Sequence, residues 1–79
     1  MTEKTFSYQQ ITTETEAFIR DEMDTLRKIM ASDPFDARIE RHRATSAGAY
    51  YLWLRLTAGF QREGDNARLL AVTFPELQS

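Results

Sequence analysis

The sequence contains no cysteine and only one histidine, His42, among its 79 residues. Without cysteine the chain can form no disulfide, no thiolate metal site and no thiol nucleophile. A single histidine excludes any metal site that is built from several imidazoles. The three glycines, Gly48, Gly59 and Gly64, are too far apart to form a phosphate-binding loop. We therefore predict neither a metal nor a cofactor, and we expect a protein that is not an enzyme.

An excess of charge of one sign is also missing. Ten Lys and Arg stand against twelve Asp and Glu, which gives a formal net charge of -2. The hydrophobic fraction of 42% and the charged fraction of 28% are close to the averages of globular domains. This composition excludes a disordered tail and a basic protein that coats nucleic acid. We expect a single domain over residues 1–79, with a thin core.

No hydrophobic run reaches the roughly 20 apolar residues that a bilayer span requires. The most apolar stretch, residues 44–60, is interrupted by Arg55. The N-terminus does not show the basic start and apolar segment of a secretory signal. We therefore expect no contact with a membrane and a cytoplasmic location.

Residues 13–31 carry the pattern of a first helix. Thr13 and Glu16 match a capping box, in which a hydroxyl and a carboxylate bind free backbone N–H groups reciprocally. Within residues 13–31 apolar residues recur at intervals of three and four, as in a helix with one buried stripe: Ile19, Met23, Leu26 and Met30, widened by Phe18 and Ile29.

For residues 1–11, where aromatic and polar side chains alternate, we expect an irregular arm or a short strand.

A second, longer helix is predicted over about 34–62. Asp33 suits its N-cap and Pro34 its first position. The regular phase across Gly48 favours one continuous helix over two shorter ones, although residues 45–48 have weak helix propensity. Its apolar seam follows steps of three and four: Phe35, Ile39, His42, Ser46, Ala49, Trp53, Leu56 and Phe60.

The C-terminal part predicts a short third helix. Gly64 suits the end of the second helix, Asp65 suits a new N-cap, and Pro75 ends a helix over 67–73. The run 70–74 also fits a strand, but a two-stranded sheet alone is marginal in water. The predicted fold class is therefore all-α, with two main antiparallel helices and a short C-terminal helix.

The second predicted helix is apolar on every side between residues 47 and 60. Such a helix is normally buried all round, and a chain of this size has little with which to surround it. We assign Trp53, Leu56 and Phe60 to the core. On its flanks we predict a protein-contact face with a polar rim of arginines: Tyr50, Tyr51 and Leu54, with Arg38, Arg41 and Arg43.

These features predict a small protein that binds another macromolecule, first of all a protein. It would act as a regulator, an adaptor or a stoichiometric inhibitor, and an inhibitor of the type carried by mobile elements fits this size. We also expect a homodimer, because the thin core and the apolar helix favour association. The alternative is a dimeric nucleic-acid-binding regulator that uses Arg38, Arg41 and Arg43. The acidic balance and the lack of a known binding motif weigh against this alternative.

His42 and Ser46 lie four residues apart on the seam of the second predicted helix. A histidine beside a serine can activate the hydroxyl as a nucleophile. That chemistry also requires an orienting acid and an oxyanion site, and the sequence indicates neither. We therefore interpret both residues as polar members of the helix seam, which set the register of packed helices.

Overall fold

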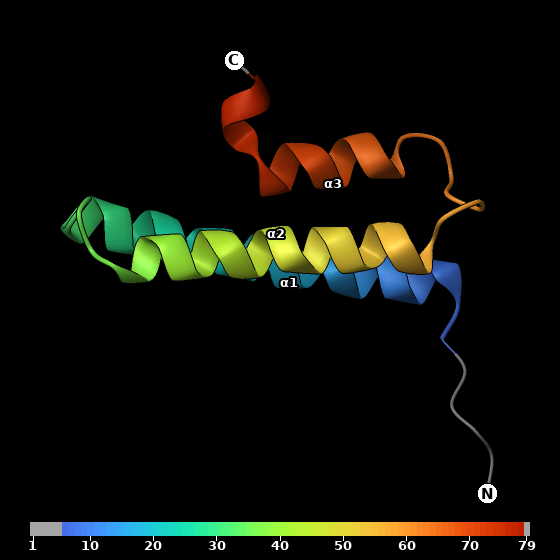
Figure 1. The fold of residues 1–79 in the computed structure, drawn as a ribbon, viewed down its shortest axis with the longest axis horizontal. Helices are drawn as coiled ribbons and strands as arrows, with labels where there is room; N and C mark the ends of the chain where they lie inside the picture. The colour runs from blue at the N-terminus through green and yellow to red at the C-terminus, as the bar shows by residue number, and fades with distance from the viewer. Residues whose placement is uncertain (1–5, 79) are drawn as a thin grey trace, which may run out of the picture.

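The computed structural model describes residues 6–78. It contains α1 (Tyr8–Ser32), α2 (Arg38–Leu56), α3 (Asp65–Thr73) and a short 3-10 helix, η1 (Pro75–Gln78). The described part of the chain has no strand, which confirms the all-α fold. α1 and α2 form an antiparallel hairpin, and α3 runs alongside them and covers one flank of the hairpin (Figure 1). Within the same range, no helix is long and apolar enough to cross a membrane.

α1 begins at Tyr8 and not near residue 13. Its N-cap is Ser7, whose hydroxyl accepts a hydrogen bond from the Gln10 N–H at 3.1 Å. The Gln10 side chain accepts in return from the Ser7 N–H at 2.9 Å. The prediction that Thr13 caps this helix was wrong, because this earlier capping box already starts it. Of the segment 1–11 that was expected to be an arm or a strand, the part from Tyr8 onward is helix, and residues 1–5 lie outside the described range.

The turn between α1 and α2 corrects a second boundary. Asp33 is the C-cap of α1 and not the N-cap of α2: its N–H makes the last helical hydrogen bond, to the Ile29 carbonyl at 2.8 Å, and its backbone is extended, with a φ of -154°. Its carboxylate accepts from the Phe35 N–H at 3.0 Å. The Asp36 carboxylate accepts from the Arg38 N–H at 2.8 Å. Each aspartate thus binds a backbone N–H two residues ahead, which favours a turn over a helix. α2 consequently starts at Arg38 and not at 34, and Phe35 lies 92% exposed at the tip of the turn.

α2 runs without a break past Gly48, as predicted, but it ends at Leu56 and not near residue 62. Gly59 follows with a φ of 89°, a left-handed conformation that glycine adopts without steric cost. The chain turns there, so Phe60 never continues the helical seam. Both Leu56 and Phe60 are exposed, and their assignment to the core was wrong.

α3 starts close to its predicted position. Its N-cap is Gly64, with a φ of 89°, and Asp65 is its first residue, so the predictions that Asp65 caps this helix and that Gly64 ends the second helix were wrong. α3 ends at Thr73, before Pro75 starts η1. The predicted third helix is therefore confirmed, and the alternative of a strand over 70–74 does not occur.

The core lies where α1, α2 and α3 meet. At its centre Trp53 is only 1% exposed, and its indole N–H donates to the Thr12 hydroxyl at 2.9 Å. The buried apolar side chains come from all three helices: Ile19, Met23, Leu26, Ile39, Tyr50, Trp53 and Leu69. α3 therefore seals one flank of the hairpin, although it has only nine residues.

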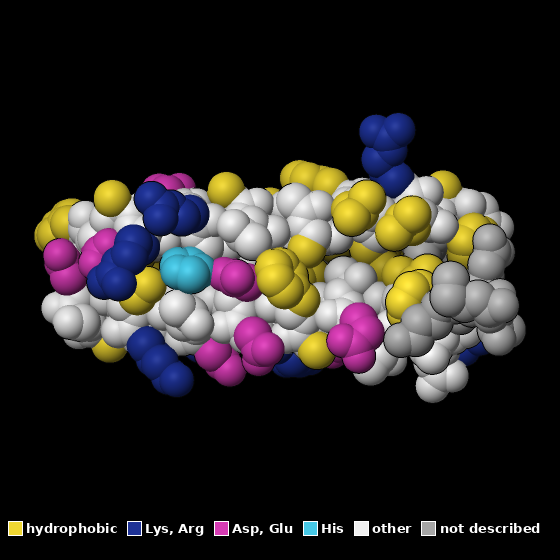
Figure 2. Space-filling model, turned by 90° about the horizontal axis from the view of Figure 1, so that it is seen from below, with side chains coloured by type: hydrophobic (Ala, Val, Ile, Leu, Met, Phe, Trp, Pro, Cys, Tyr) yellow, Lys and Arg dark blue, Asp and Glu magenta, His cyan; other side chains and the backbone are white. Residues whose placement is uncertain are grey.

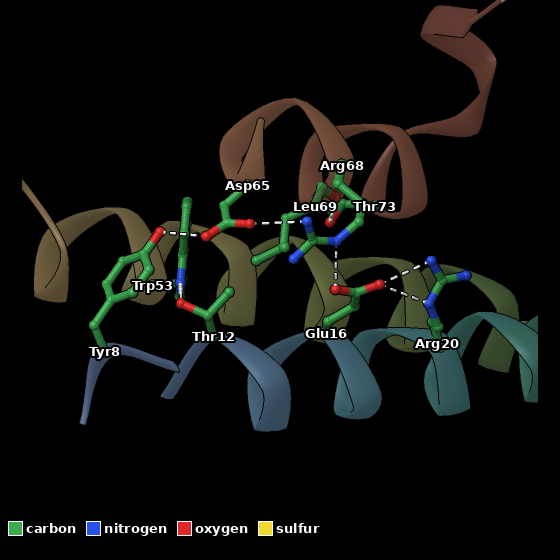
Figure 3. A network of polar contacts seen from close by, with 9 residues as sticks. All are labelled: Tyr8, Thr12, Glu16, Arg20, Trp53, Asp65, Arg68, Leu69 and Thr73. Carbon is green, nitrogen blue, oxygen red and sulfur yellow. Dashed lines mark hydrogen bonds and ion pairs between the residues drawn. The ribbon is translucent and has the colours of Figure 1, made fainter. Parts of the chain in front are cut away.

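A network of polar contacts fixes α3 to α1 (Figure 3). The Tyr8 hydroxyl donates to the Asp65 carboxylate at 2.7 Å. Arg68 donates to Glu16 at 2.7 Å and to Asp65 at 2.8 Å, and Arg20 also donates to Glu16 at 2.8 Å. The hydrogen bonds from Tyr8 and Arg68 hold the pKa of Asp65 below its ordinary value. Burial alone would raise the pKa of Glu16, but the two arginines outweigh it and lower that pKa.

Candidate functional site

The flank of the hairpin opposite α3 carries large apolar side chains that the described chain leaves half exposed. Phe18 of α1 is 45% exposed, and Leu52 and Leu56 of α2 are 57% and 51% exposed. The three side chains surround one shallow hollow, to which Thr15 and Ala49 also contribute. Figure 2 views this flank and shows hydrophobic side chains along it, next to the histidine. Contiguous exposed apolar surface of this kind marks interaction sites.

We call this surface the open face. It combines apolar residues from both long helices with polar residues at their edges: Glu14, Thr15, Phe18, Glu22, His42, Ala49, Leu52 and Leu56.

The spacing of these residues explains why they share a side of the hairpin. Residues three or four apart on a helix project in nearly the same direction. Thr15, Phe18 and Glu22 follow this spacing on α1, and Ala49, Leu52 and Leu56 follow it on α2. They form a second stripe on each helix, beside the stripe that is buried under α3. The second stripes are exposed because α3 covers only the opposite flank.

His42 and Glu22 form a polar bridge across the open face. The His42 Nδ1 contacts the Glu22 carboxylate, and both side chains are about one quarter exposed or less. Ser46, four residues along α2, is fully buried, and its hydroxyl has no hydrogen-bond partner within residues 6–78. His42 therefore contacts a carboxylate on α1 and makes no hydrogen bond to the Ser46 hydroxyl. In the same range no three His, Asp or Glu side chains gather in a way that could hold a metal ion.

The structure separates the three predicted contact residues of α2. Tyr50 is only 5% exposed, and its hydroxyl donates to the Asn66 side chain in α3 at 2.5 Å. Burial and the neighbouring Tyr51 raise the pKa of Tyr50. Leu54 packs partly buried against the same core, whereas Tyr51 is exposed. The cause is α3, which lies over the side of α2 that Tyr50 occupies.

The three predicted rim arginines do not form one rim either. Arg38 donates to the Asp36 carboxylate at 2.8 Å, and this bond lowers the pKa of Asp36 to about 2. Arg41 and Arg43 lie two positions apart, so their side chains leave the helix in different directions. Arg43 lines a hollow beside the C-terminal end of α3, together with Met23. All three arginines are exposed, but Arg38 and Arg41 lie one turn apart on one side of α2, whereas Arg43 lies on another side, beside the C-terminal end of α3.

The residues that form the open face were only partly visible in the sequence. Phe18 was read as the edge of a buried stripe, and Leu56 was assigned to the core. One feature of the sequence does point to these residues. Its helices have more apolar positions than three short helices can bury, so some of these positions must be exposed.

The comparisons with known proteins add no relative. No protein-family model matches the chain, and no curated protein and no solved structure matches it. The function is therefore inferred from the geometry of the open face. The open face combines an apolar centre, formed by side chains of α1 and α2, with a polar edge that includes the His42–Glu22 contact.

Proposed function

We propose that this protein binds another protein through the open face, as a regulator, an adaptor or a stoichiometric inhibitor. The observation that carries this proposal is the group of Phe18, Leu52 and Leu56, which are half exposed around one hollow. Covering apolar surface contributes about 25 cal/mol per Å² removed from water. A partner that covers all three side chains would supply the driving force for association without any chemistry at the site.

The form of the open face favours a helical partner. The hollow lies between two antiparallel helices, and its walls are side chains at intervals of three and four residues. The side-chain ridge of another helix fits between such rows. An amphipathic helix recognised in this way presents apolar anchors at the same intervals. Glu14 at one end and the His42–Glu22 contact at the other would meet its polar edges.

The alternative function, nucleic-acid binding, depends on Arg38, Arg41 and Arg43. The carboxylate of Asp36 neutralises Arg38, and Arg43 lies beside α3 and away from Arg41. Phosphate recognition requires several cations that act together, and its affinity falls steeply as salt rises. The arrangement of these arginines favours protein binding, and capture of a partner with and without nuclease distinguishes protein binding from nucleic-acid binding.

The test is capture of a partner by tagged protein, with and without nuclease. We compare the wild type with the double variant Leu52→Glu/Leu56→Glu and with Phe35→Glu as a matched control. Phe35 is also an exposed apolar residue, but it lies at the tip of the turn, away from the open face. We expect a protein that the wild type and Phe35→Glu retain and the double variant loses, regardless of nuclease.

Circular dichroism shows whether the double variant keeps its helix content. Equal recovery by all three proteins would contradict binding through the open face. Recovery that disappears after nuclease treatment, and that weakens steeply with salt, would favour the arginines and the nucleic-acid function.

A further inference from the structure

We propose that, without another protein, the open face is covered by a second copy of this chain. The two hairpins would form an antiparallel four-helix bundle, with a twofold axis that runs along the helices. This inference rests on the proposed function, because it names an occupant of the same face. The shape of the face and the distribution of its charges support this arrangement.

The open face has the shape of half a four-helix bundle. Two antiparallel helices each present a stripe with intervals of three and four residues, the pattern that packs against a second pair of helices. α2 has 19 residues and is therefore about 28 Å long, and two packed helices are about 20 Å wide. The face thus covers on the order of 600 Å² per subunit. Two subunits together reach the lower limit of stable protein interfaces, about 1,200 Å².

The two edges of the open face carry opposite charges. Glu14, Asp21 and Glu22 lie at the edge that α1 forms, spaced for one side of the helix. Arg41 lies at the edge that α2 forms, and Arg38 lies one turn earlier, where the Asp36 carboxylate of the same chain already pairs with it. In Figure 2 acidic side chains follow one edge of the face, with a basic side chain at the end of that edge, and basic side chains lie near the histidine at the other edge. The face is therefore complementary to itself once one copy is turned over.

The direction of the twofold axis follows from these edges. An axis along the helices places α1 of one copy against α2 of the other, so that acidic and basic edges meet. An axis across the helices places α1 against α1 and brings carboxylates together, which disfavours association. In both arrangements every neighbouring pair of helices is antiparallel, so the helix dipoles attract in each and the charged edges decide between them.

The apolar residues support the same axis. Rotation about an axis along the helices keeps each residue at its own level on the hairpin. The hollow around Phe18 and Leu52 then faces the same hollow in the second copy. Because Glu22 is level with His42 in one chain, Asp21 and Glu22 come to the level of Arg41 in the other. The crosswise axis would place the apolar half of the face on the charged half.

The absence of cysteine allows a direct test. A spin label on Phe35→Cys reports the position of the turn between α1 and α2, which is exposed. In the proposed dimer both turns lie at the same end, and the label-to-label distance is below about 30 Å, close to the width of a bundle. In the crosswise dimer the turns lie at opposite ends, and the distance exceeds about 40 Å. Sedimentation velocity on the purified chain gives the mass of the labelled species.

Variants test the charges and the apolar contact separately. Leu52→Glu should leave a monomer. Arg41→Glu should raise the dimer dissociation constant about tenfold, because the twofold axis repeats each lost pair. Adding Asp21→Arg should restore most of that loss. Arg55→Glu is the matched control on the outward side of α2, and it should leave the dissociation constant unchanged.

A dimer with a short label distance supports the proposal, and a dimer with a long distance overturns the arrangement. A chain that stays monomeric at about 100 μM overturns self-association, since an interface of standard size is largely populated at that concentration. This last result leaves the proposed function intact, because partner capture by the wild type and its loss in Leu52→Glu/Leu56→Glu are measured independently.

Discussion

The two flanks of the α1–α2 hairpin use the same helices and the same residue spacing, but they differ in what lies over them. On the flank beneath α3, Ile19 of α1 and Trp53 of α2 are fully buried. On the open face, Phe18, Leu52 and Leu56 remain half exposed. Because α3 has only nine residues, it can cover one of the two stripes on each helix and not both. The presence of a third layer, and not the apolar pattern itself, decides which stripe becomes core.

The side chains of the two flanks also differ in chemistry. Beneath α3, Tyr8, Tyr50 and Trp53 each bury an aromatic ring and direct a polar group to a partner on another element. Such residues suit a boundary where one end is apolar and the other polar. Leu52 and Leu56 have no polar group to satisfy, so a protein surface can cover them without leaving an unpaired donor or acceptor. This contrast supports the proposal that a protein covers the open face.

The largest expected difference between the flanks is in stability. Trp53→Ala removes a buried ring and leaves the Thr12 hydroxyl without its donor. Substitutions of this kind cost about 3–5 kcal/mol, and a domain of 79 residues has a total stability of about 4–12 kcal/mol. Leu52→Ala on the open face should cost less than about 1 kcal/mol. Urea denaturation followed by circular dichroism at micromolar protein concentration measures both.

A second substitution at the same position keeps this comparison measurable if Trp53→Ala fails to fold. Trp53→Phe keeps a buried aromatic ring but loses the indole N–H and part of the ring volume, so we expect a loss of about 1–2 kcal/mol, smaller than for Trp53→Ala. Equal losses of unfolding free energy for Trp53→Phe and Leu52→Ala would mean that the flank beneath α3 contributes no more to stability than the open face. That result would contradict the predicted difference between the flanks.

The parts of the fold that depend on local chemistry could be predicted from the sequence. The seam of α2 keeps its phase across Gly48, and α3 lies between Gly64 and Pro75 as predicted, although Gly64 is its N-cap and does not end α2. The start of α1 was mispredicted, because two capping boxes fit the sequence and only the packing of Tyr8 against the core and α3 selects the earlier one.

The candidate site was harder to predict because it depends on contacts between distant parts of the chain. Tyr50 and Leu52 lie two residues apart in one apolar run, and the sequence treats them alike. α3 covers the first and leaves the second exposed. The position of α3 is set by contacts with residues far earlier in the chain, such as the bonds of Arg68 to Glu16 and of Asp65 to Tyr8.

Because of the polar network between α1 and α3, the free energy of unfolding should depend on pH. Part of this pH dependence should come from Arg68. The folded state lowers the pKa of Glu16 and of Asp65. A carboxylate with a lowered pKa in the folded state contributes stability above its unfolded pKa and loses it as the pH falls. The unfolded values are 4.5 and 3.8, so stability should decrease as the pH falls below about 5. Urea denaturation at pH values from 7 to 3 measures this loss.

Arg68→Met should reduce stability by about 1 kcal/mol at pH 7, because the arginine is partly exposed and its ion pairs are screened by water. At pH 3 the difference from the wild type should become smaller, since protonated carboxyl groups no longer attract the arginine. Arg55→Met is the control, because Arg55 is exposed at the end of α2 and makes no ion pair among residues 6–78. Parallel pH curves for the wild type and Arg68→Met would exclude this role of Arg68.

The smallest effect on the free energy of unfolding should come from a buried hydroxyl on the flank beneath α3. Ser46 is fully buried in α2, and its hydroxyl has no partner within the described range. Removing an unsatisfied buried hydroxyl relieves a desolvation cost, and alanine also has the higher helix propensity. Ser46→Ala should therefore raise the free energy of unfolding by about 1 kcal/mol.

Thr45→Ala separates these two contributions to the effect of Ser46→Ala. Thr45 is the neighbouring residue of the same helix, but it is exposed and its hydroxyl donates to the Arg41 carbonyl at 2.8 Å. Its replacement gains helix propensity without any change in buried polar groups, so it should stabilise the protein by less than Ser46→Ala. If the two variants gain equally in urea denaturation, the buried hydroxyl carries no cost. If Ser46→Ala instead loses stability, the hydroxyl has a partner in the core, and the sealed flank is fully satisfied.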